Sequence, residues 1–314
     1  MITLLLNSLV PIFAVIGLGY FAGRSGYLDN HHVLQWNVLV MDFALPASLF
    51  VATASTSRIE LIEEWPLLVV LVVSTLALYA LCYWMQRRLF GLGSSEASGQ
   101  TLTIALPNYA AALPLIAPVL GPTHTVDVAL AVAAGSIMLS PLTLAVLEGN
   151  KAPTAVKRTR TTVLLTIGHS LLKPIVLGPL AGIVFRAIGV SLPETVSRSF
   201  ELIGQATGGV ALFLTGLILS AQSIELRANV VSGTLLKNIV HPLLAFGLIL
   251  MLPIARDTAR AAVILCALPS GFLGVLFELR YGLNVPVAGS TLLVSSLAST
   301  VTLTIALVLT AGWS

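Results

Sequence analysis

The sequence contains very little charge. Only 9% of its 314 residues are charged and 57% are hydrophobic, whereas a soluble domain carries roughly 25% charged residues. A soluble protein of this length could bury a large core, but it would still need a charged surface, which this chain cannot supply. The composition therefore excludes an ordinary soluble protein and favours a polytopic membrane protein with lipid as its outer solvent.

Several kinds of reactive site are also absent. The sequence has no GxxxxGK[ST] phosphate-binding loop and no HExxH, CxxC or GxSxG motif, so we expect no enzyme, no metal site and no cofactor. The two cysteines, Cys82 and Cys266, lie in apolar segments and are expected to be buried free thiols. The net charge of +3 is not gathered into a basic patch with aromatics, so nucleic acid is not an expected partner.

The chain does contain ten apolar segments, each near the ~20 residues with which an α-helix crosses a membrane. Helices are expected because lipid offers no partner for open backbone groups. The predicted fold class is an all-α polytopic membrane protein with ten transmembrane helices. The segments are residues 3–23, 33–54, 66–86, 98–120, 126–147, 162–186, 196–220, 229–252, 258–280 and 286–311.

Basic residues predict the orientation in the membrane. No positive residue precedes the first segment, and Arg24 follows it, so the N-terminus is predicted outside and the first loop inside. The linker 148–161 falls on the same side as Arg24 and is rich in lysine and arginine. Because ten crossings return the chain to its starting side, both termini are predicted outside a bacterial-type inner membrane.

The two halves of the chain resemble each other. A shift of 162 or 163 residues places Pro11 on Pro174, Gly19 on Gly182, Phe50 on Phe213 and Pro107 on Pro269. Five helices per half is an odd number, so the second half must enter the membrane upside down, the usual plan of secondary transporters. The predicted organisation is a first repeat at 1–147, a basic cytoplasmic linker at 148–161 and an inverted second repeat at 162–314.

Proline falls in the middle of two matching segments. Pro107 and Pro269 each remove a backbone donor and clash with the carbonyl four residues earlier. We expect both helices to be broken and to cross at their breaks, with half-helix dipoles meeting at the bilayer midplane. In the alternative, the prolines only kink the helices, and neighbouring polar residues make ordinary interhelical contacts. The predicted substrate site is Pro107, Asn108, Tyr109, Pro269, Ser270 and Gly271.

Ionisable residues inside the segments need a reason, because each costs at least ~2.5–3.5 kcal/mol at mid-membrane. Lys237 and His241 are four residues apart and therefore share one helix face. One interpretation is a cationic lobe for a substrate carboxylate, with His241 as a proton-linked switch. The other is a lysine that snorkels to the membrane interface beside a histidine bonded within the core. Asp42 and Lys173 are interpreted as a structural ion pair, or Asp42 as a group that binds a proton during transport. His169 and Lys173 repeat the four-residue spacing.

Several stretches resemble the auxin efflux carrier family, which includes plant auxin carriers and bacterial permeases for malonate, malate and related organic anions. They are IGLGYFAGRSGYLD at 16–29, LVMDFALPASLF at 39–50, TGGVALFLTGLILS at 207–220 and ALPSGFLGVLFELRYGLN at 267–284. The resemblance runs along nearly the whole chain. The plant carriers have asparagine on both sides of the first crossover proline, whereas this chain has Leu106 before it, so a carboxylate smaller than auxin is expected.

The resemblance implies an elevator-type transporter. Helices 1, 2, 6 and 7 would form a scaffold that also holds a homodimer, and helices 3–5 and 8–10 would form a mobile transport unit. The predicted function is secondary active transport or uniport of a small mono- or dicarboxylate. Two alternatives stay open: a sodium-coupled carrier of bile-acid-transporter-like architecture, and a non-transporting membrane sensor on the same fold.

Overall fold

The structure is a computed structural model that describes residues 2–28, 33–55, 64–121, 124–151, 172–189, 192–221, 225–283 and 286–313. This part of the chain is all helical and has no strand, as the sequence predicts. The helices are α1 (Ile2–Arg24), α2 (Val33–Val38), η2 (Leu39–Ala44), α3 (Leu45–Ser55), α5 (Trp65–Arg88), α6 (Ser94–Ala105), η3 (Tyr109–Ala111), α7 (Ala112–Leu120), α8 (Thr125–Lys151), α10 (Pro174–Ala187), α11 (Glu194–Gly204), α12 (Ala206–Ser220), α13 (Ala228–Leu235), η5 (Leu236–Val240), α14 (His241–Ile249), α15 (Arg256–Ala267), α16 (Leu273–Arg280), α17 (Pro286–Thr310) and η6 (Ala311–Trp313).

Six helical stretches within the described residues are long and apolar enough to cross a membrane, so the protein is a multi-pass membrane protein. The sequence predicts ten spans. Two predicted segments, 98–120 and 258–280, each contain two short helices, and the described part of the segment 162–186 begins at residue 172. His169, and the predicted linker from residue 152 onward, lie outside the described residues. The six spans are Gln35–Ser55, Trp65–Arg88, Leu130–Asn150, Glu194–Ser220, Ala228–Ile249 and Pro286–Trp313.

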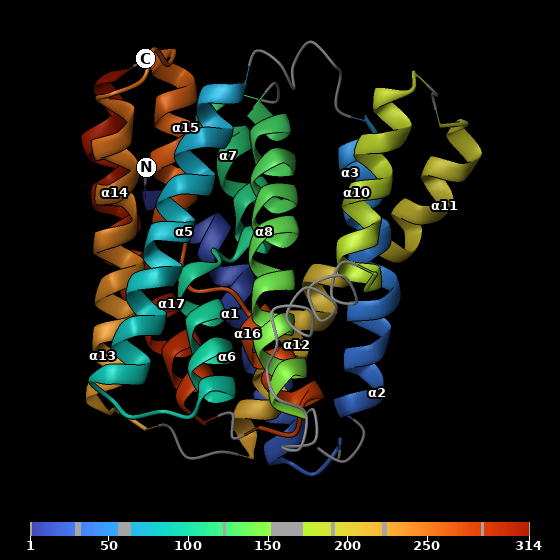
Figure 1. Cartoon of the computed structure of the whole chain (residues 1–314), viewed down its shortest axis with the longest axis vertical. Helices are drawn as coiled ribbons and strands as arrows, with labels where there is room; N and C mark the ends of the chain where they lie inside the picture. The colour runs from blue at the N-terminus through green and yellow to red at the C-terminus, as the bar shows by residue number, and fades with distance from the viewer. Residues whose placement is uncertain are drawn as a thin grey trace.

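The helices run mostly along the long axis of the molecule and form two groups (Figure 1). Helices α2, α3, α10 and α11 stand together on the right of the view, and α5, α6, α8 and α13 to α15 stand on the left. The most extensive packing joins α1 to α12 and α3 to α10. Both ends of the chain lie in the upper half of the view.

Glycines allow those two helix pairs to approach closely. A Cβ at Gly19 would collide with the carbonyl oxygen of Phe213, and a Cβ at Gly182 would collide with the carbonyl oxygen of Phe50. Helices in membranes often pack through such small residues, because lipid supplies no hydrophobic force that would bring them together. The backbones of α1 and α12, and those of α3 and α10, are therefore in direct contact.

Two π-helical turns interrupt the longer helices. Each turn lies directly before a helix that carries proline at its second position: η2 precedes Pro46, and η5 precedes Pro242. Proline lacks an N–H and clashes with the carbonyl four residues earlier, so a locally wider turn relieves the conflict. These two turns carry Asp42 and Lys237, two of the charged residues that the sequence places at mid-membrane.

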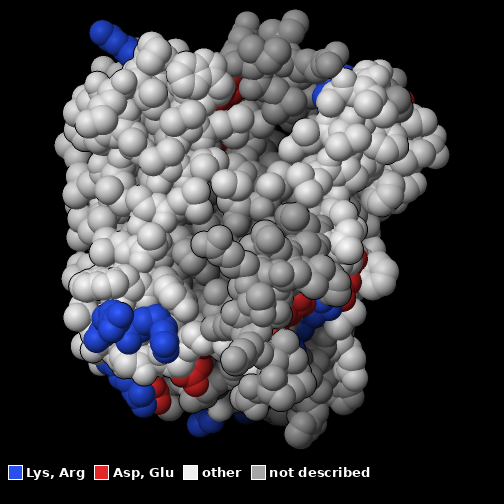
Figure 2. Space-filling view, viewed as in Figure 1, with Lys and Arg blue, Asp and Glu red and all other residues white. Residues whose placement is uncertain are grey.

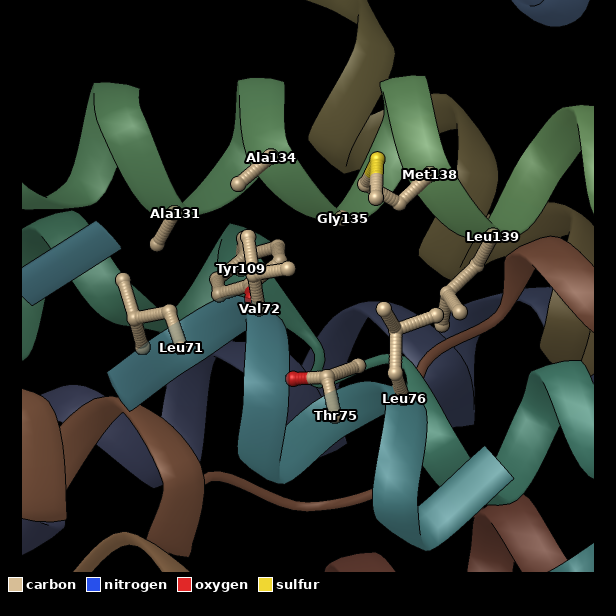
Figure 3. Close-up of a pocket in the computed structure, with 10 residues that line it drawn as sticks. All are labelled: Leu71, Val72, Thr75, Leu76, Tyr109, Ala131, Ala134, Gly135, Met138 and Leu139. Carbon is tan, nitrogen blue, oxygen red and sulfur yellow. The ribbon is translucent and has the colours of Figure 1, made fainter. Parts of the chain in front are cut away.

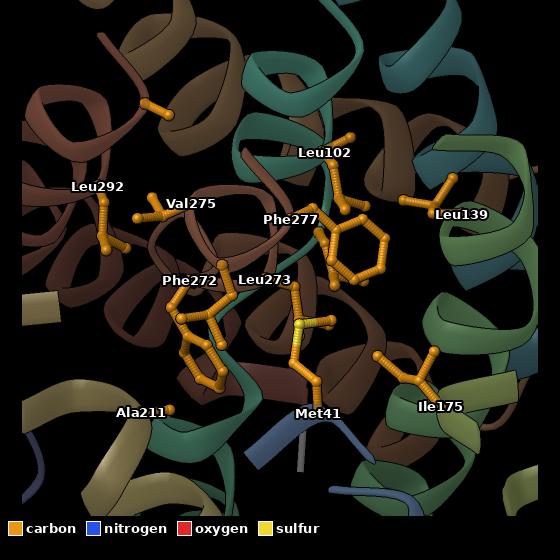
Figure 4. Packing of buried hydrophobic residues seen from close by; sticks show 14 of the residues in the cluster. Met41, Leu102, Leu139, Ile175, Ala211, Phe272, Leu273, Val275, Phe277 and Leu292 are labelled. Atoms are coloured by element: carbon orange, nitrogen blue, oxygen red, sulfur yellow. The ribbon is translucent and has the colours of Figure 1, made fainter. Parts of the chain in front are cut away.

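Helix α16 is buried between the two groups of helices. Phe277 of α16 is fully buried and shares one apolar cluster with Leu102, Leu139, Met41 and Ile175 (Figure 4). Leu102 and Leu139 come from α6 and α8, whereas Met41 and Ile175 come from η2 and α10. The contact between the groups is thus largely apolar at this depth.

Charge is scarce on the surface as well. The face in Figure 2 is mostly uncharged; most of its charged side chains lie in the lower half of the view, and a few lie at the upper end. Helix α5 ends with Arg87 and Arg88. Large apolar side chains such as Phe21 and Leu309 are exposed instead, as expected where lipid is the solvent.

Candidate substrate-binding site

The chain leaves the helical conformation twice, each time just before a proline. Helix α6 ends at Ala105, and Leu106 is extended with φ −87° and ψ 120°. Helix α15 ends at Ala267, and Leu268 is extended with φ −55° and ψ 150°. The ring of a following proline disfavours the α conformation, so Leu106 and Leu268 adopt extended geometry for the same local reason. We call residues 106–108 the first break and residues 268–272 the second break.

The two breaks lie side by side and bond to each other. Pro107 and Ser270 face one another across an isolated antiparallel bridge. The N–H of Asn108 donates to the carbonyl of Pro269 at 2.8 Å, and the N–H of Gly271 donates to the carbonyl of Leu106 at 2.7 Å. Pro107 occupies the position of the bridge that forms no hydrogen bond, so its missing N–H costs nothing there.

Gly271 fits where no other residue would. A Cβ at this position would lie 2.5 Å from the carbonyl oxygen of Leu106 and 3.1 Å from that of Pro107. Both neighbours are main-chain atoms, which cannot move aside as a flexible side chain could. Glycine therefore permits the close approach of the two breaks.

The second break is also held by side chains that the sequence analysis did not single out. The N–H of Ser270 donates to Ser295 Oγ at 2.9 Å, and Ser295 Oγ donates to Asn238 Oδ1 at 2.6 Å. Asn238 Nδ2 in turn donates to the carbonyl of Ser295 at 2.9 Å. A buried amide in the apolar segment 229–252 is the signal that could have identified this network.

Asn108 and Ser270 are both completely buried. The hydroxyl oxygen of Ser270 has no hydrogen-bond partner among the described residues. A buried polar group normally finds a partner, but neither Asn108 nor Ser270 is among the described residues that line the adjacent cavity. Asn108 can both donate and accept through its amide.

A cavity of about 450 Å³ lies against the two breaks. Its volume is within the range of roughly 300–1,000 Å³ that is usual for ligand pockets. Leu106 and Pro107 of the first break line it together with the following Tyr109, and Gly271 and Phe272 of the second break line it together with the following Leu273. The other walls come from α3, α8, α11 and α12, with the polar residues Ser48, Ser136, Glu201, Gln205 and Thr207.

Tyr109 occupies the boundary between this cavity and a second, much smaller pocket. In Figure 3 its ring lies between α5 and α8, near Leu71 and Ala131. Gly135 leaves room for the ring, because a Cβ there would lie 2.5 Å from Leu106 Cδ1 and 3.4 Å from Tyr109 Cε2. The glycine on α8 thus makes room for the side chains of Leu106 and Tyr109.

Lys237 and His241 lie together, as their spacing predicts, but they do not line the cavity. Lys237 is fully buried, and its Nζ donates to the carbonyl of Cys266 at 2.8 Å and to His241 Nδ1 at 2.7 Å. Cys266 belongs to the last turn of α15, where the helix dipole is negative. The ammonium of Lys237 therefore caps the half-helix that ends at the second break.

His241 is fully engaged in this arrangement. Its Nδ1 accepts from Lys237, and its Nε2 lies 3.3 Å from Thr75 Oγ1. With Nδ1 as acceptor, Nε2 carries the hydrogen and donates to Thr75. Both ring nitrogens thus have protein partners within α5 and η5.

The chain matches a known family along nearly its full length. A family model described as "Membrane transport protein" matches residues 4–307. The chain belongs to the auxin efflux carrier family of membrane transport proteins. The members of this family are transporters and not enzymes.

Three relatives in the family are 24–28% identical to the chain. The "Uncharacterized transporter YfdV" of Escherichia coli K12 is 26% identical over 307 residues, 96% of each chain. The "Putative malonate transporter" of Rhizobium meliloti strain 1021 is 28% identical over 306 residues, 94% of this chain and 92% of the relative. "Auxin efflux carrier component 8" of Arabidopsis thaliana is 24% identical over 149 residues, 44% of this chain and 41% of the relative.

In this family member, Asp42 and Lys173 do not form the ion pair that the sequence analysis expected between them. Asp42 accepts two hydrogen bonds from the guanidinium of Arg280, at 2.6 and 3.0 Å. Lys173 Nζ lies 2.8 Å from Glu148 Oε1, which also accepts from Tyr281 at 3.0 Å. The partners come from the ends of α8 and α16, which the sequence analysis had counted as helix ends and loops.

The guanidinium of Arg280 thus engages both carboxylate oxygens of Asp42. The two ion pairs surround a small cavity with Met41 and Phe277 at its wall. They join η2 and α10 on one side to α8 and α16 on the other. The charged cluster therefore links the two groups of helices near one end of the molecule.

Proposed function

We propose that the chain is a secondary active transporter or uniporter for a small organic anion, which binds in the cavity beside the two breaks. The observation that carries this proposal is the cavity itself, since both breaks contribute to its wall. The name of the Rhizobium relative, a putative malonate transporter, favours a short mono- or dicarboxylate.

Anion binding at this site would rest on main-chain groups and hydroxyls. No lysine or arginine is among the described residues that line the cavity. Helix α16 begins at Leu273, a lining residue, and the first N–H groups of a helix have no partner within the helix and favour negative charge. The hydroxyl of Ser270 and the amide of Asn108 lie in the adjoining breaks but do not line the cavity, so they would reach the substrate only if the breaks move apart. This arrangement suits a carboxylate that is bound without a fixed cation.

The ten-span inverted repeat is part of the same proposal. A shift of 163 residues converts the contact between Gly19 and Phe213 into the contact between Phe50 and Gly182. The same shift relates two further neighbouring pairs: Gly216 lies against the carbonyl of Ile16, and Thr53 donates to the carbonyl of Pro179 at 3.1 Å. Contacts that repeat with the sequence shift support two structurally equivalent halves, residues 1–147 and 162–314.

The way the cavity is built supports an elevator mechanism as part of this proposal. Helices α3, α11 and α12 line one side and would belong to the scaffold, with α1 and α10. The breaks and α8 line the other side and would belong to the transport unit, α5 to α8 and α13 to α17. Sliding of the transport unit would carry the site with it and break the ion pairs of Asp42 and Lys173. Dimerisation through the scaffold, as the family resemblance implies, completes this proposal.

The proposed orientation of the protein in the membrane rests on where its basic residues lie. Arg24, Arg87 and Arg88 lie in the last turns of α1 and α5, and lysine and arginine are enriched at the cytoplasmic face of a membrane. The charged end of the molecule would thus face the cytoplasm of a bacterial cell, and both termini would lie outside the inner membrane.

Thermal unfolding of the purified protein tests the substrate class. A panel of mono- and dicarboxylates, at two pH values and in sodium or potassium buffer, should raise the unfolding temperature for at least one short carboxylate, because a ligand at 100 times its Kd stabilises by about 2.7 kcal/mol. A response to sodium alone would favour the sodium-coupled alternative. The absence of a shift with every carboxylate would contradict the substrate class.

The variant Asn108→Ala tests the site. It should remain folded, lose the shift with malonate and lose malonate uptake in vesicles. Asn150→Ala is a matched control, since Asn150 is exposed, does not line the cavity, and donates to Ser94 and Ser95. Unchanged uptake by Asn108→Ala would place the substrate elsewhere.

A further inference from the structure

One buried acid takes no part in the site or in the charged cluster. Glu278 lies in α16 and is only 2% exposed. Its Oε2 has no hydrogen-bond partner, and no ion pair of Glu278 is found among the described residues. The side chain fills the space that a Cβ at Gly99 would occupy, since such a Cβ would lie 2.5 Å from Glu278 Oε1. A glycine on α6 thus makes room for a carboxyl group.

The surroundings offer this carboxyl group no positive charge. Helix α16 packs mainly against α6, α2 and α17. Helix α6 carries one charged residue, Glu96, whereas α2 and α17 carry no titratable residue. On α16 itself the charged neighbour is Arg280, whose guanidinium is bound to Asp42. The charge that faces Glu278 from a packed element is therefore negative.

An ionised carboxylate without a partner is very costly in a buried site, and such a group takes up a proton instead. Glu278 stands only two residues before the end of α16, where the side chain of Arg280 is about one third exposed. The carboxyl group of Glu278 is neutral while it is buried and can ionise when the environment of α16 changes.

We propose that Glu278 is the proton-binding site that couples substrate movement to the proton gradient. The inference rests on the proposed transport function. The carboxylate binds one proton on the side where the anion enters, crosses with the transport unit as the neutral acid, and releases the proton on the other side. It replaces Asp42 and His241 in this role, since Asp42 is held by Arg280 and both nitrogens of His241 are bonded.

Infrared difference spectroscopy on the purified protein tests the protonation directly and needs no substrate. The wild-type protein at neutral pH should show the carbonyl stretch of a protonated carboxylic acid, and Glu278→Gln should lose this band. Glu96→Gln, which removes the neighbouring acid on α6, should retain it. A wild-type spectrum in which the band is unaffected by Glu278→Gln would overturn the proposal, whatever the substrate is.

Proteoliposomes that contain a trapped pH dye test the coupling. A malonate gradient should move protons through the wild-type protein, and Glu278→Gln should still move malonate while proton movement falls at least tenfold. Glu278→Asp, which keeps the acid, should retain proton movement and serves if the glutamine variant folds poorly. Malonate uptake without protons in the wild type would refute the coupling but leave the transport proposal standing. Lack of any carboxylate uptake would instead refute transport, with the infrared result unaffected.

Discussion

The two breaks start from the same three residues, Ala-Leu-Pro, yet their helix ends are capped in different ways. At the first break, the end of α6 receives a main-chain donor from the second break: the N–H of Gly271 lies 3.1 Å from the carbonyl of Thr103 and 2.7 Å from that of Leu106. At the second break, the end of α15 receives the ammonium of Lys237 at the carbonyl of Cys266. One end is capped by backbone and the other by a charged side chain.

The difference in capping can be traced to one pair of equivalent positions, related by the 162-residue shift between the two halves. The shift places Lys237 on Thr75, which offers a hydroxyl in place of an ammonium, and that hydroxyl contacts His241 and not a carbonyl of α6. Only the second half therefore carries its own cap, and the first break depends on the second for its donor. From this asymmetry we expect damage at the second break to spread to both breaks.

The largest effect is expected for Gly271→Ala. The added methyl group would force the main chains of the two breaks apart, with an overpacking cost of about 3 kcal/mol, and would move the N–H of residue 271 away from the carbonyls of Thr103 and Leu106. Malonate binding and stability should both be lost. Thermal unfolding and binding by titration calorimetry measure these effects.

Gly247→Ala is the matched control for this variant. No atom lies within 4 Å of a Cβ at Gly247, which is in α14, so alanine should be neutral or raise stability by up to ~1 kcal/mol. Equal effects of the two substitutions would show that the close approach of the breaks is unimportant.

Lys237→Met should weaken the second break and, through it, the first. It leaves the carbonyl of Cys266 and Nδ1 of His241 without their charged donor, which costs about 1.5–3 kcal/mol. Because Lys237 does not line the cavity, binding of malonate and of a neutral amide analogue should weaken by the same factor. A larger loss of affinity for malonate than for the neutral analogue would indicate that Lys237 contacts the substrate.

Thr75→Val should have a smaller effect than Lys237→Met. The substitution keeps the shape of the side chain and removes a hydrogen bond to His241 Nε2, worth about 0.5–1.5 kcal/mol. The unfolding temperature should fall only slightly, with malonate affinity unchanged. A loss as large as that of Lys237→Met would mean that the two halves are supported symmetrically.

Glu201→Gln should produce the smallest effect, and it should raise malonate affinity where the other variants lower affinity or stability. Glu201 lines the cavity and is exposed, so its charge repels a bound anion through solvent-screened electrostatics worth ~1 kcal/mol or less. Malonate should bind a few times more tightly to the variant at low salt and equally at high salt. Weaker binding would mean that Glu201 contacts the substrate directly.

The local geometry of each break could be predicted from the sequence, because it depends on a dipeptide. Leu106 and Leu268 are extended since each precedes a proline. The pairing of Lys237 with His241 was likewise predictable from their spacing on one helix. The role of the six predicted substrate-site residues stays a prediction.

Contacts between helices far apart in the chain could not be predicted in this way. Asp42 was matched with Lys173 on the basis of depth alone, but its partner Arg280 is 238 residues away, at the end of a short half-helix. The direction of Lys237 toward Cys266 depends on which helix η5 packs against. Glu278 was overlooked because its burial follows from the neighbouring Gly99. Such features depend on tertiary packing, which periodicity does not encode.

A cryo-EM structure determined in saturating malonate tests the central claim most directly. We predict malonate density in the cavity, in contact with the segment Pro107–Tyr109 and with the segment Ser270–Leu273. Malonate bound away from both breaks, or an empty cavity at saturating malonate, would contradict the proposed site.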